Sequence, residues 1–187
     1  MDGLGALGHG LSQLNRHVEA LDCYQEALDV LEVILSDSNS FLALAHYRLA
    51  GSLEELGRDE EALENLRVGL GICEELYPGD HPDIHHGLHR VGSLLTRSGQ
   101  VEEGLETCER ALAMATRLGA EDRHAVAARL ASLILDNGGD VAKAATLYSG
   151  AIDDIEGRRQ ATGVLTEEDR ADYFSYLKQH GAYEGLV

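Results

Sequence analysis

Residues 49–66 are LAGSLEELGRDEEALENL, and 42 residues later residues 91–108 are VGSLLTRSGQVEEGLETC. The two stretches share an order of large apolar, small and glycine residues, although few residues are identical. Residues 7–24, LGHGLSQLNRHVEALDCY, have the same order 42 residues before the first stretch. Three copies at one fixed interval indicate a repeat architecture, in which each copy is a structural unit that packs on the next.

The apolar residues within each copy have helical spacing. In residues 49–66, Leu49 and Leu53 are four apart, and after a break Ala62 and Leu66 are again four apart. This spacing is typical of amphipathic helices and does not fit a strand. The break holds a residue that tolerates the left-handed conformation which ends a helix, namely Asn15, Gly57 and Gly99 in the three copies. Each copy is therefore predicted to be a helix hairpin.

A small residue stands early in each predicted second helix. The three residues are Ala20, Ala62 and Gly104. A small side chain lets two helices approach closely, whereas a large one would push them apart. We therefore expect these residues to lie where the two helices of a hairpin touch.

The first copy resembles the tetratricopeptide repeat. The residues that carry the resemblance are Leu7, Gly8, Leu11, Ala20, Tyr24 and Ala27. The long period, together with the Gly-Asp-His-Pro-Asp linker at residues 79–83, is similar to the kinesin light chain branch of that family. The resemblance implies an all-α fold, a right-handed α-solenoid of about four helix-turn-helix repeats plus a C-terminal helix.

The repeat boundaries follow from the polar linkers and the glycine turns. We expect a repeat array over residues 1–160, divided at about 1–38, 40–78, 82–119 and 122–160, and a capping helix with a tail over 161–187. In the fourth repeat, Ala144, Tyr148 and Ala151 restore the spacing of the first. The last helix is predicted from Thr166 to about His180, since Thr166 with Asp169 forms a helix-start signal.

Composition excludes several classes of protein. The chain has 187 residues, with 15 Lys and Arg against 33 Asp and Glu, for a formal net charge of −18. Such a chain repels nucleic acid and anionic membranes. It has no run of 18 apolar residues and no basic segment typical of a signal peptide, so we expect a cytoplasmic protein.

No motif in the sequence indicates catalysis or a bound cofactor. The chain has no G-x-S-x-G turn and no phosphate-binding glycine loop after a strand, and its cysteines, Cys23, Cys73 and Cys108, are scattered as reduced packing residues. His85 and His89, one helical turn apart, could pair on a metal, but no third ligand stands nearby. We therefore predict no enzyme, cofactor or metal. His81, His85, His86 and His89 are interpreted as a solvated or ligand-facing cluster, with a pH-dependent contact as an alternative.

The resemblance also implies where a partner would bind. In tetratricopeptide arrays, residues near the large apolar position of each first helix face a concave groove that holds peptides. Transferred to this sequence, that pattern gives as candidate groove residues Tyr47, Arg48, His86, His89, Arg90, Arg97 and Arg129. Leu44, one helical turn before Arg48, belongs to the same set. The arginines would suit a carboxylate-bearing segment, because a guanidinium binds carboxylates with two parallel hydrogen bonds. The alternative is that each arginine pairs with a glutamate of the adjacent helix.

Two classes of function remain open from the sequence. The first is a non-catalytic scaffold that binds a protein or peptide partner, with an acidic partner favoured. The second is a regulatory arm of a larger enzyme, because residues 166–187 resemble the segment that joins tetratricopeptide arrays to CHAT protease domains. Self-association through the open ends of the array is a further alternative.

Overall fold

The structure is a computed structural model that describes residues 2–34 and 39–162, and over these residues the chain is helical without any strand. The eight helices are α1 (Asp2–Gln13), α2 (His17–Ile34), α3 (Ser40–Glu55), α4 (Asp59–Leu76), α5 (Pro82–Arg97), α6 (Val101–Leu118), α7 (Arg123–Asp136) and α8 (Val141–Thr162). None of these helices is long and apolar enough to cross a membrane.

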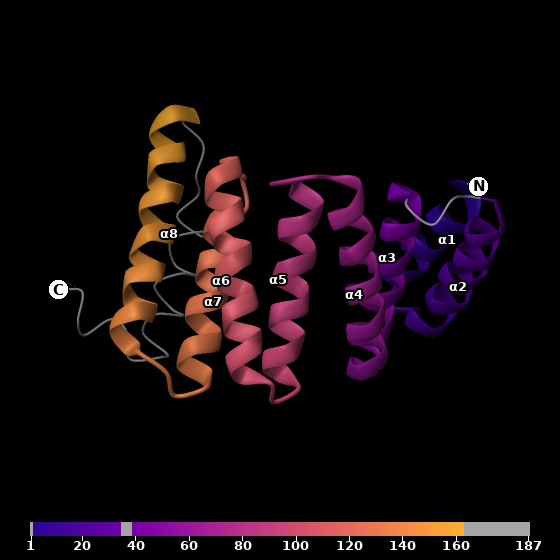
Figure 1. Cartoon of the computed structure of the whole chain (residues 1–187), viewed down its shortest axis with the longest axis horizontal. Helices are drawn as coiled ribbons and strands as arrows, with labels where there is room; N and C mark the ends of the chain where they lie inside the picture. Colours follow the sequence, from indigo (N-terminus) through magenta and orange to yellow (C-terminus); the bar gives the residue numbers. More distant parts are fainter. Residues whose placement is uncertain (1, 35–38, 163–187) are drawn as a thin grey trace.

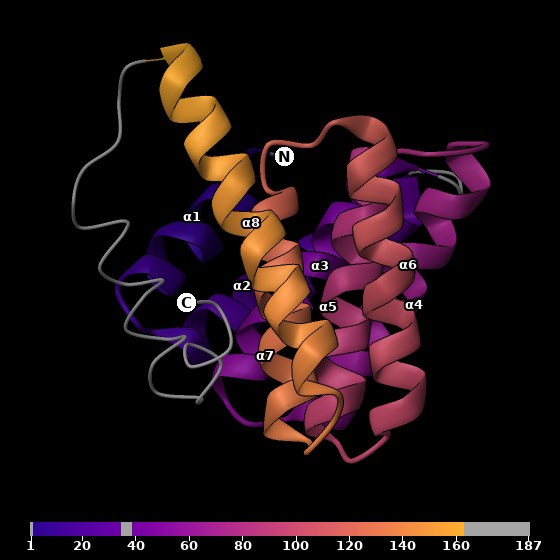
Figure 2. The same cartoon turned by 90° about the vertical axis from the view of Figure 1, so that its left-hand side faces the viewer.

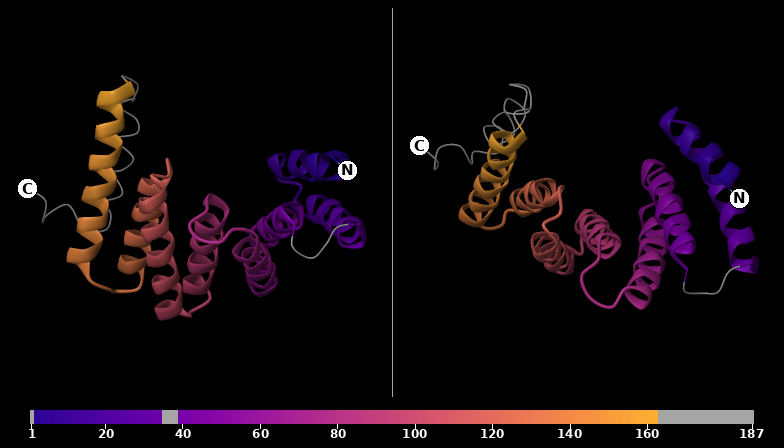
Figure 3. Two further views of the ribbon diagram at one scale, coloured as in Figure 1. Left: turned by 45° about the horizontal axis from the view of Figure 1, so that its top comes forward. Right: turned by 90° about the horizontal axis from the view of Figure 1, so that it is seen from above.

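The helices form an α-solenoid, as predicted. Each helix packs against the helices before and after it in the chain, so that the pairs α1/α2, α3/α4, α5/α6 and α7/α8 follow one another along the long axis (Figure 1). The view from the α8 end shows α8 in front of the other helices (Figure 2), and the view from above shows that the array is curved (Figure 3). The predicted capping helix from Thr166 lies outside the described residues.

The turn inside each hairpin uses the left-handed conformation that the sequence predicts. Asn15, Gly57 and Gly99 have φ of 57°, 71° and 86°, and Gly138 has φ of 68° in the fourth hairpin. In each turn the following backbone N–H donates to the carbonyl five residues back, as from Arg58 to Leu53 over 2.9 Å. These bonds pair carbonyls that the end of a helix would otherwise leave unpaired.

Small residues lie at the closest helix contacts. Ala20 and Ala62 are fully buried, and Gly104 meets Gly92 where α5 and α6 cross. A Cβ atom added at Gly104 would lie 2.7 Å from the Gly92 carbonyl oxygen, and one at Gly92 would lie 2.8 Å from the Gly104 carbonyl oxygen. The backbones of α5 and α6 are thus in direct contact, so neither glycine leaves room for a side chain.

Replacing Ala62 with leucine should lower the free energy of unfolding by ~1–3 kcal/mol, since a larger side chain at a fully buried helix contact overpacks the core. Urea unfolding of the variant and the parent measures this difference. Exposed Ala113 in α6 is the control, where the same substitution should change stability by no more than about 0.5 kcal/mol. Equal stability of the Ala62 variant and the parent would contradict the close contact.

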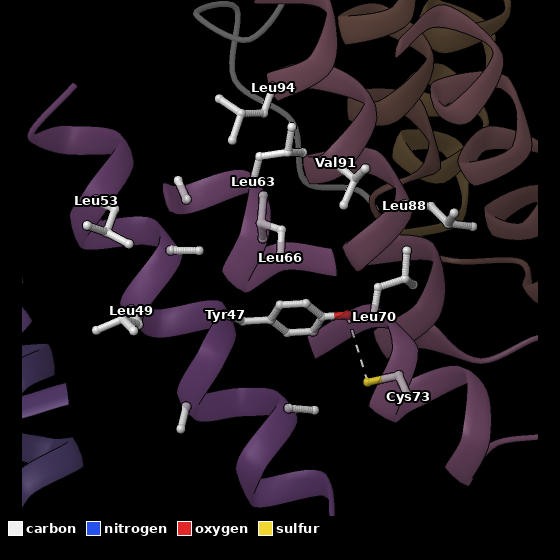
Figure 4. Close-up of a cluster of buried hydrophobic side chains, with 14 of the residues drawn as sticks. Tyr47, Leu49, Leu53, Leu63, Leu66, Leu70, Cys73, Leu88, Val91 and Leu94 are labelled. Atoms are coloured by element: carbon white, nitrogen blue, oxygen red, sulfur yellow. Dashed lines mark hydrogen bonds between the residues drawn. The ribbon is translucent and has the colours of Figure 1, made fainter. Parts of the chain in front are cut away.

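Tyr47 lies in the core, which corrects its expected place in the groove. The side chain is 7% exposed and extends from α3 toward α4 and α5 (Figure 4). Its hydroxyl lies 3.3 Å from the Asp83 carbonyl oxygen and 3.8 Å from the Cys73 sulfur. The ring occupies space left by two glycines, because a Cβ atom at either Gly69 or Gly87 would collide with it.

Repeat two departs from the repeat pattern in the helix that supplies its aromatic ring. Repeats one and four carry a buried tyrosine on the second helix, Tyr24 and Tyr148, where repeat two has Leu66. In repeat two the aromatic ring comes instead from the first helix, through Tyr47. The repeat therefore keeps an aromatic ring in its core although the ring belongs to a different helix.

Candidate functional site

Arg48, Arg90 and Arg129, called the aligned arginines below, occupy equivalent positions on α3, α5 and α7. Arg90 is the most constrained of them. One of its terminal nitrogens donates to the Tyr47 carbonyl oxygen over 2.8 Å, and the other lies 2.6 Å from Glu54 Oε1. The Arg90 and Glu54 side chains are 19% and 22% exposed. Arg90 therefore links α5 to α3 within the array.

Arg97, at the end of α5, also forms ion pairs with carboxylates of the preceding repeat. Its terminal nitrogens lie 3.0 Å from Asp59 Oδ1 and 3.6 Å from Glu54 Oε2. Arg90 and Arg97 thus follow the alternative interpretation, in which arginines pair with carboxylates of the preceding repeat. Both guanidiniums are paired with carboxylates inside the array, although the Arg97 side chain is still 40% exposed.

The other two aligned arginines lack a carboxylate partner in the described part of the chain. Arg48 is half-buried and donates to the Gly5 carbonyl oxygen of α1 over 3.4 Å, a long contact. Arg129 is exposed and makes neither an ion pair nor a hydrogen bond with residues 2–34 or 39–162. These two guanidiniums remain available to an anionic group from outside the array.

A pocket of about 720 Å³ opens beside Arg48, between α1, α2 and α3, and is called the α1–α3 pocket below. Small residues of α1 leave this space open, and apolar side chains of α2 and α3 line it. Three of those side chains are well exposed, Val30 at 42%, Phe41 at 61% and Leu44 at 43%. Exposed apolar side chains gathered in one hollow are typical of a site that a partner covers.

Sequence reasoning found part of this pocket. It placed Leu44 and Arg48 on the partner-facing side, but it did not find Val30 or Phe41. Both lie near the polar linker between α2 and α3, where the apolar stripe of a helix is difficult to follow. Their large apolar side chains next to a linker were the available signal.

Two histidines of the predicted cluster, His86 and His89, lie three positions apart on α5. His86 is exposed and contacts the Tyr47 ring edge to face, with 6.3 Å between the ring centres, and His89 is half-buried. Burial, together with His86 and Arg129, lowers the pKa of His89 to about 4. The Nε2 atom of His89 is buried without a hydrogen-bond partner among the described residues. Burial also lowers the pKa of His86, so both imidazoles are mainly neutral at pH 7.

His85 is buried and lies next to Asp122. It is 4% exposed, and its Nε2 lies 3.7 Å from Asp122 Oδ1. Within residues 2–34 and 39–162, no group of three or more His, Cys, Asp or Glu side chains could hold a metal ion.

Acidification should destabilise the fold through His89. Its pKa is about 4 in the folded chain and about 6.5 when unfolded, so below pH 6.5 the unfolded chain binds a proton that the folded chain does not. The stability present above pH 6.5 is lost as the pH falls toward 4, by about 2 kcal/mol between pH 6.5 and 4.5. Urea unfolding at several pH values would measure this loss, which should be smaller in His89→Asn. An identical pH profile for both proteins would contradict the assignment.

The buried cysteines are poor nucleophiles. Burial raises the pKa of the Cys108 thiol to about 11 and also raises that of Cys73. A thiol needs its thiolate form to react, so both cysteines act as packing groups at neutral pH.

The second helices carry the acidic surface. Exposed carboxylates on α4 and α6 include Glu60, Glu61, Glu64, Glu102, Glu103 and Glu106. Arg48 and Arg129 are on first helices, so the cationic groups without partners and the acidic surface belong to different helices of each pair.

Part of the chain matches a known repeat family. Residues 2–75 match the family model described as tetratricopeptide repeat. No curated protein matches the sequence. One similar solved structure is a putative kinesin light chain of Podosopora anserina with nearly identical TPR-like repeats. The two chains are 19% identical, with a TM-score of 0.73, and the alignment covers 98% of this chain and 94% of that chain. At this identity the likeness shows the fold alone.

Two further structures extend the comparison. BtubC (BKLC) from P. vanneervenii has 19% identity and a TM-score of 0.78, covering 97% of this chain and 73% of that chain. The Rap conjugation gene regulator of the plasmid pLS20, solved in complex with the Phr* peptide, has 16% identity and a TM-score of 0.66, covering 78% of this chain and 40% of that chain. The chain therefore has the fold of tetratricopeptide arrays, including kinesin light chain-like ones. The tail that resembles the segment before CHAT domains lies outside the described residues.

Proposed function

We propose that this tetratricopeptide-type array is a non-catalytic scaffold that binds a segment of a partner protein, with the α1–α3 pocket as its anchoring site. The observation that carries the proposal is the pocket of about 720 Å³ with three exposed apolar side chains at its rim. Ligand sites are typically apolar hollows of about 300–1,000 Å³ with few polar groups. The Rap regulator, which shares the fold, is known with a bound peptide, and this supports the same class of function by analogy.

The pocket fits an apolar side chain of the partner. Val30, Phe41 and Leu44 would lose contact with water when such a side chain enters. Full burial of one large apolar side chain contributes about 1.5–3 kcal/mol, so a single anchor accounts for a measurable share of the binding free energy.

Arg48 favours an acidic residue next to that anchor. Its guanidinium lines the pocket and has no carboxylate partner among the described residues, in a chain whose net charge is −18. A partner carboxylate would form charge-assisted hydrogen bonds with it. Carboxylates elsewhere on the partner would be repelled by the acidic second helices, which would orient the bound segment.

The test is selection of peptides from a random displayed library, followed by affinity measurement on variants. Leu44→Ser should weaken the selected peptides by at least about tenfold, which corresponds to ~1.4 kcal/mol of lost contact. The matched control is Val68→Ser on α4, because Val68 is also 43% exposed but does not line the pocket. It should leave affinity unchanged.

Stability distinguishes loss of the site from loss of the fold. Leu44 and Val68 are both exposed, so the free energy of unfolding of each variant should lie within about 0.5 kcal/mol of that of the parent. Selected peptides that bind Leu44→Ser and the parent equally would place the binding site elsewhere on the array. A library that gives no binder would contradict the proposed function itself.

A further inference from the structure

The first helix, α1, lies at one end of the array and packs against α2 and α3 (Figure 1). Leu7 of α1 is 54% exposed, whereas the equivalent residues of the next two repeats, Leu49 and Val91, are 4% and 5% exposed. In those repeats the first helix packs against the second helix of the preceding repeat, α3 against α2 and α5 against α4. Within residues 2–34 and 39–162, no helix packs on α1 in that way, so an apolar position that the array buries elsewhere is open to solvent.

Leu7 belongs to an exposed stripe along α1. Gly3, Leu7, Gly10 and Leu14 follow one another at intervals of four, three and four residues, which places them on one helix face. All four are exposed, Leu14 at 68%. Leu14 directly follows α1, and its N–H still donates to the Gly10 carbonyl oxygen over 3.2 Å, so it keeps the helical register. These four residues are called the α1 stripe below.

Internal packing accounts for only two of the four glycines of α1. A Cβ atom at Gly5 or Gly8 would lie 3.1 Å or 2.7 Å from a side chain of another helix. A Cβ atom at Gly3 or Gly10 would meet no described atom within 4 Å. Glycine is a poor helix former, so these two residues weaken α1 without improving the packing of the described chain. They leave room on the exposed face for the side chains of a second helix.

The charge of α1 distinguishes it from the rest of the array. The chain has a formal net charge of −18, and 26% of its residues are charged. Among the twelve residues of α1, Asp2 is the one Asp, Glu, Lys or Arg. On α2, Val18 is 59% exposed, where the equivalent residues of repeats two and three are Glu60 and Glu102. Two copies of the chain that met through their acidic second helices would repel each other, whereas at α1 they can approach without that repulsion.

We propose that the α1 stripe is the contact between two copies of this chain, with the two α1 helices packed antiparallel about a two-fold axis. In this arrangement Leu7 of one copy faces Gly10 of the other, and Leu14 of one copy faces Gly3 of the other. Each leucine thus lies opposite a glycine, and the stripe is complementary to itself. A parallel pair would instead place leucine against leucine and glycine against glycine, which leaves gaps between the helices.

The association should be weak and should tighten as salt is added. One short helix from each copy makes a small interface, so we expect a Kd of about 10–100 µM. The remaining surfaces of both copies are acidic and repel each other, and salt screens this repulsion over about 8 Å at physiological ionic strength. The Kd should therefore fall by at least about threefold between low and high salt. The proposal does not rest on the proposed function, since Gly3 is the only residue that the α1 stripe shares with the α1–α3 pocket.

The experiment is sedimentation equilibrium of the whole chain at concentrations below and above the expected Kd. Leu7→Gln should weaken the dimer at least about tenfold, because each copy loses an apolar side chain from the contact. Val141→Gln on α8 is the matched control, since Val141 has the same exposed fraction of 54% as Leu7. This control should leave the Kd unchanged.

Gly10→Leu distinguishes specific helix packing from general apolar association. A leucine at position 10 would face Leu7 of the other copy, so it should weaken the dimer at least about tenfold although it makes the surface more apolar. In the single chain the new side chain begins in open space, and leucine is a better helix former than glycine, so the melting temperature should not fall. The control is Gly150→Leu on α8, an exposed glycine with the same open surroundings, which should leave the Kd unchanged.

Three results would overturn the proposal. The first is a monomer at every concentration, and the second is a dimer that Leu7→Gln leaves intact or that Gly10→Leu leaves intact or tightens. The third is growth beyond the dimer, because a contact between opposite ends of the array would be open-ended, whereas a two-fold contact closes at two copies. Since no peptide is used, this experiment and the peptide selection on Leu44→Ser can fail independently of each other.

Discussion

Replacing Tyr47 with alanine should lower the free energy of unfolding by about 3–5 kcal/mol, the usual cost of removing a buried aromatic ring and leaving a cavity. The ring is 7% exposed and fills the space that Gly69 and Gly87 leave between α4 and α5. These glycines have no side chain that could move into the cavity, so relaxation would be limited. Urea unfolding followed by circular dichroism would measure the loss.

A double-mutant cycle tests whether Gly87 and Tyr47 are fitted to each other. A Cβ atom at Gly87 would collide with the Tyr47 hydroxyl oxygen, so Gly87→Ala should be destabilising. Tyr47→Phe removes only that oxygen, whose hydrogen bonds are long, and should cost no more than about 1 kcal/mol. In the Tyr47→Phe background, Gly87→Ala should therefore cost at least ~1 kcal/mol less. Strictly additive effects would show that the two residues are not in contact.

The sequence predicts the hairpins because their signals are local. The left-handed turn at Gly57 and the small residue at Ala62 are set by residues a few positions apart. The place of Tyr47 depends instead on Gly69 and Gly87, which are 22 and 40 positions further along the chain. A pattern transferred from a repeat family assigns such a residue by its position in the repeat, and it cannot account for glycines in other helices.

In the candidate site, too, the features set by nearby residues were predicted and those set by distant residues were not. Leu44 and Arg48 were predicted from one helix, whereas the α1–α3 pocket requires three helices and the small residues of α1. The resemblance predicted a line of arginines in the groove, but the pairing of Arg90 with Glu54 joins residues 36 positions apart. Only the packed array distinguishes an arginine that has an internal carboxylate partner from one that does not.

Arg90→Glu should lower the free energy of unfolding by about 2–4 kcal/mol, because it removes a largely buried ion pair and places a second carboxylate beside Glu54. The hydrogen bond to the Tyr47 carbonyl oxygen is lost as well. Exchanging both charges, in Arg90→Glu with Glu54→Arg, should recover part of the loss, because an ion pair is restored without that hydrogen bond. Thermal and urea unfolding of the parent and the two variants would measure these differences.

Arg48→Glu is the matched comparison, since Arg48 occupies the equivalent position one repeat earlier. It has no carboxylate partner in the described part of the chain and only a 3.4 Å contact with Gly5, so reversal should cost no more than about 1 kcal/mol. Binding of selected peptides should show the opposite order, because Arg48 lines the α1–α3 pocket and Arg90 does not. Peptides with an acidic residue should lose at least about tenfold in affinity for Arg48→Glu. Equal losses of stability in the two reversed variants would contradict the distinction between a structural and a partner-binding arginine.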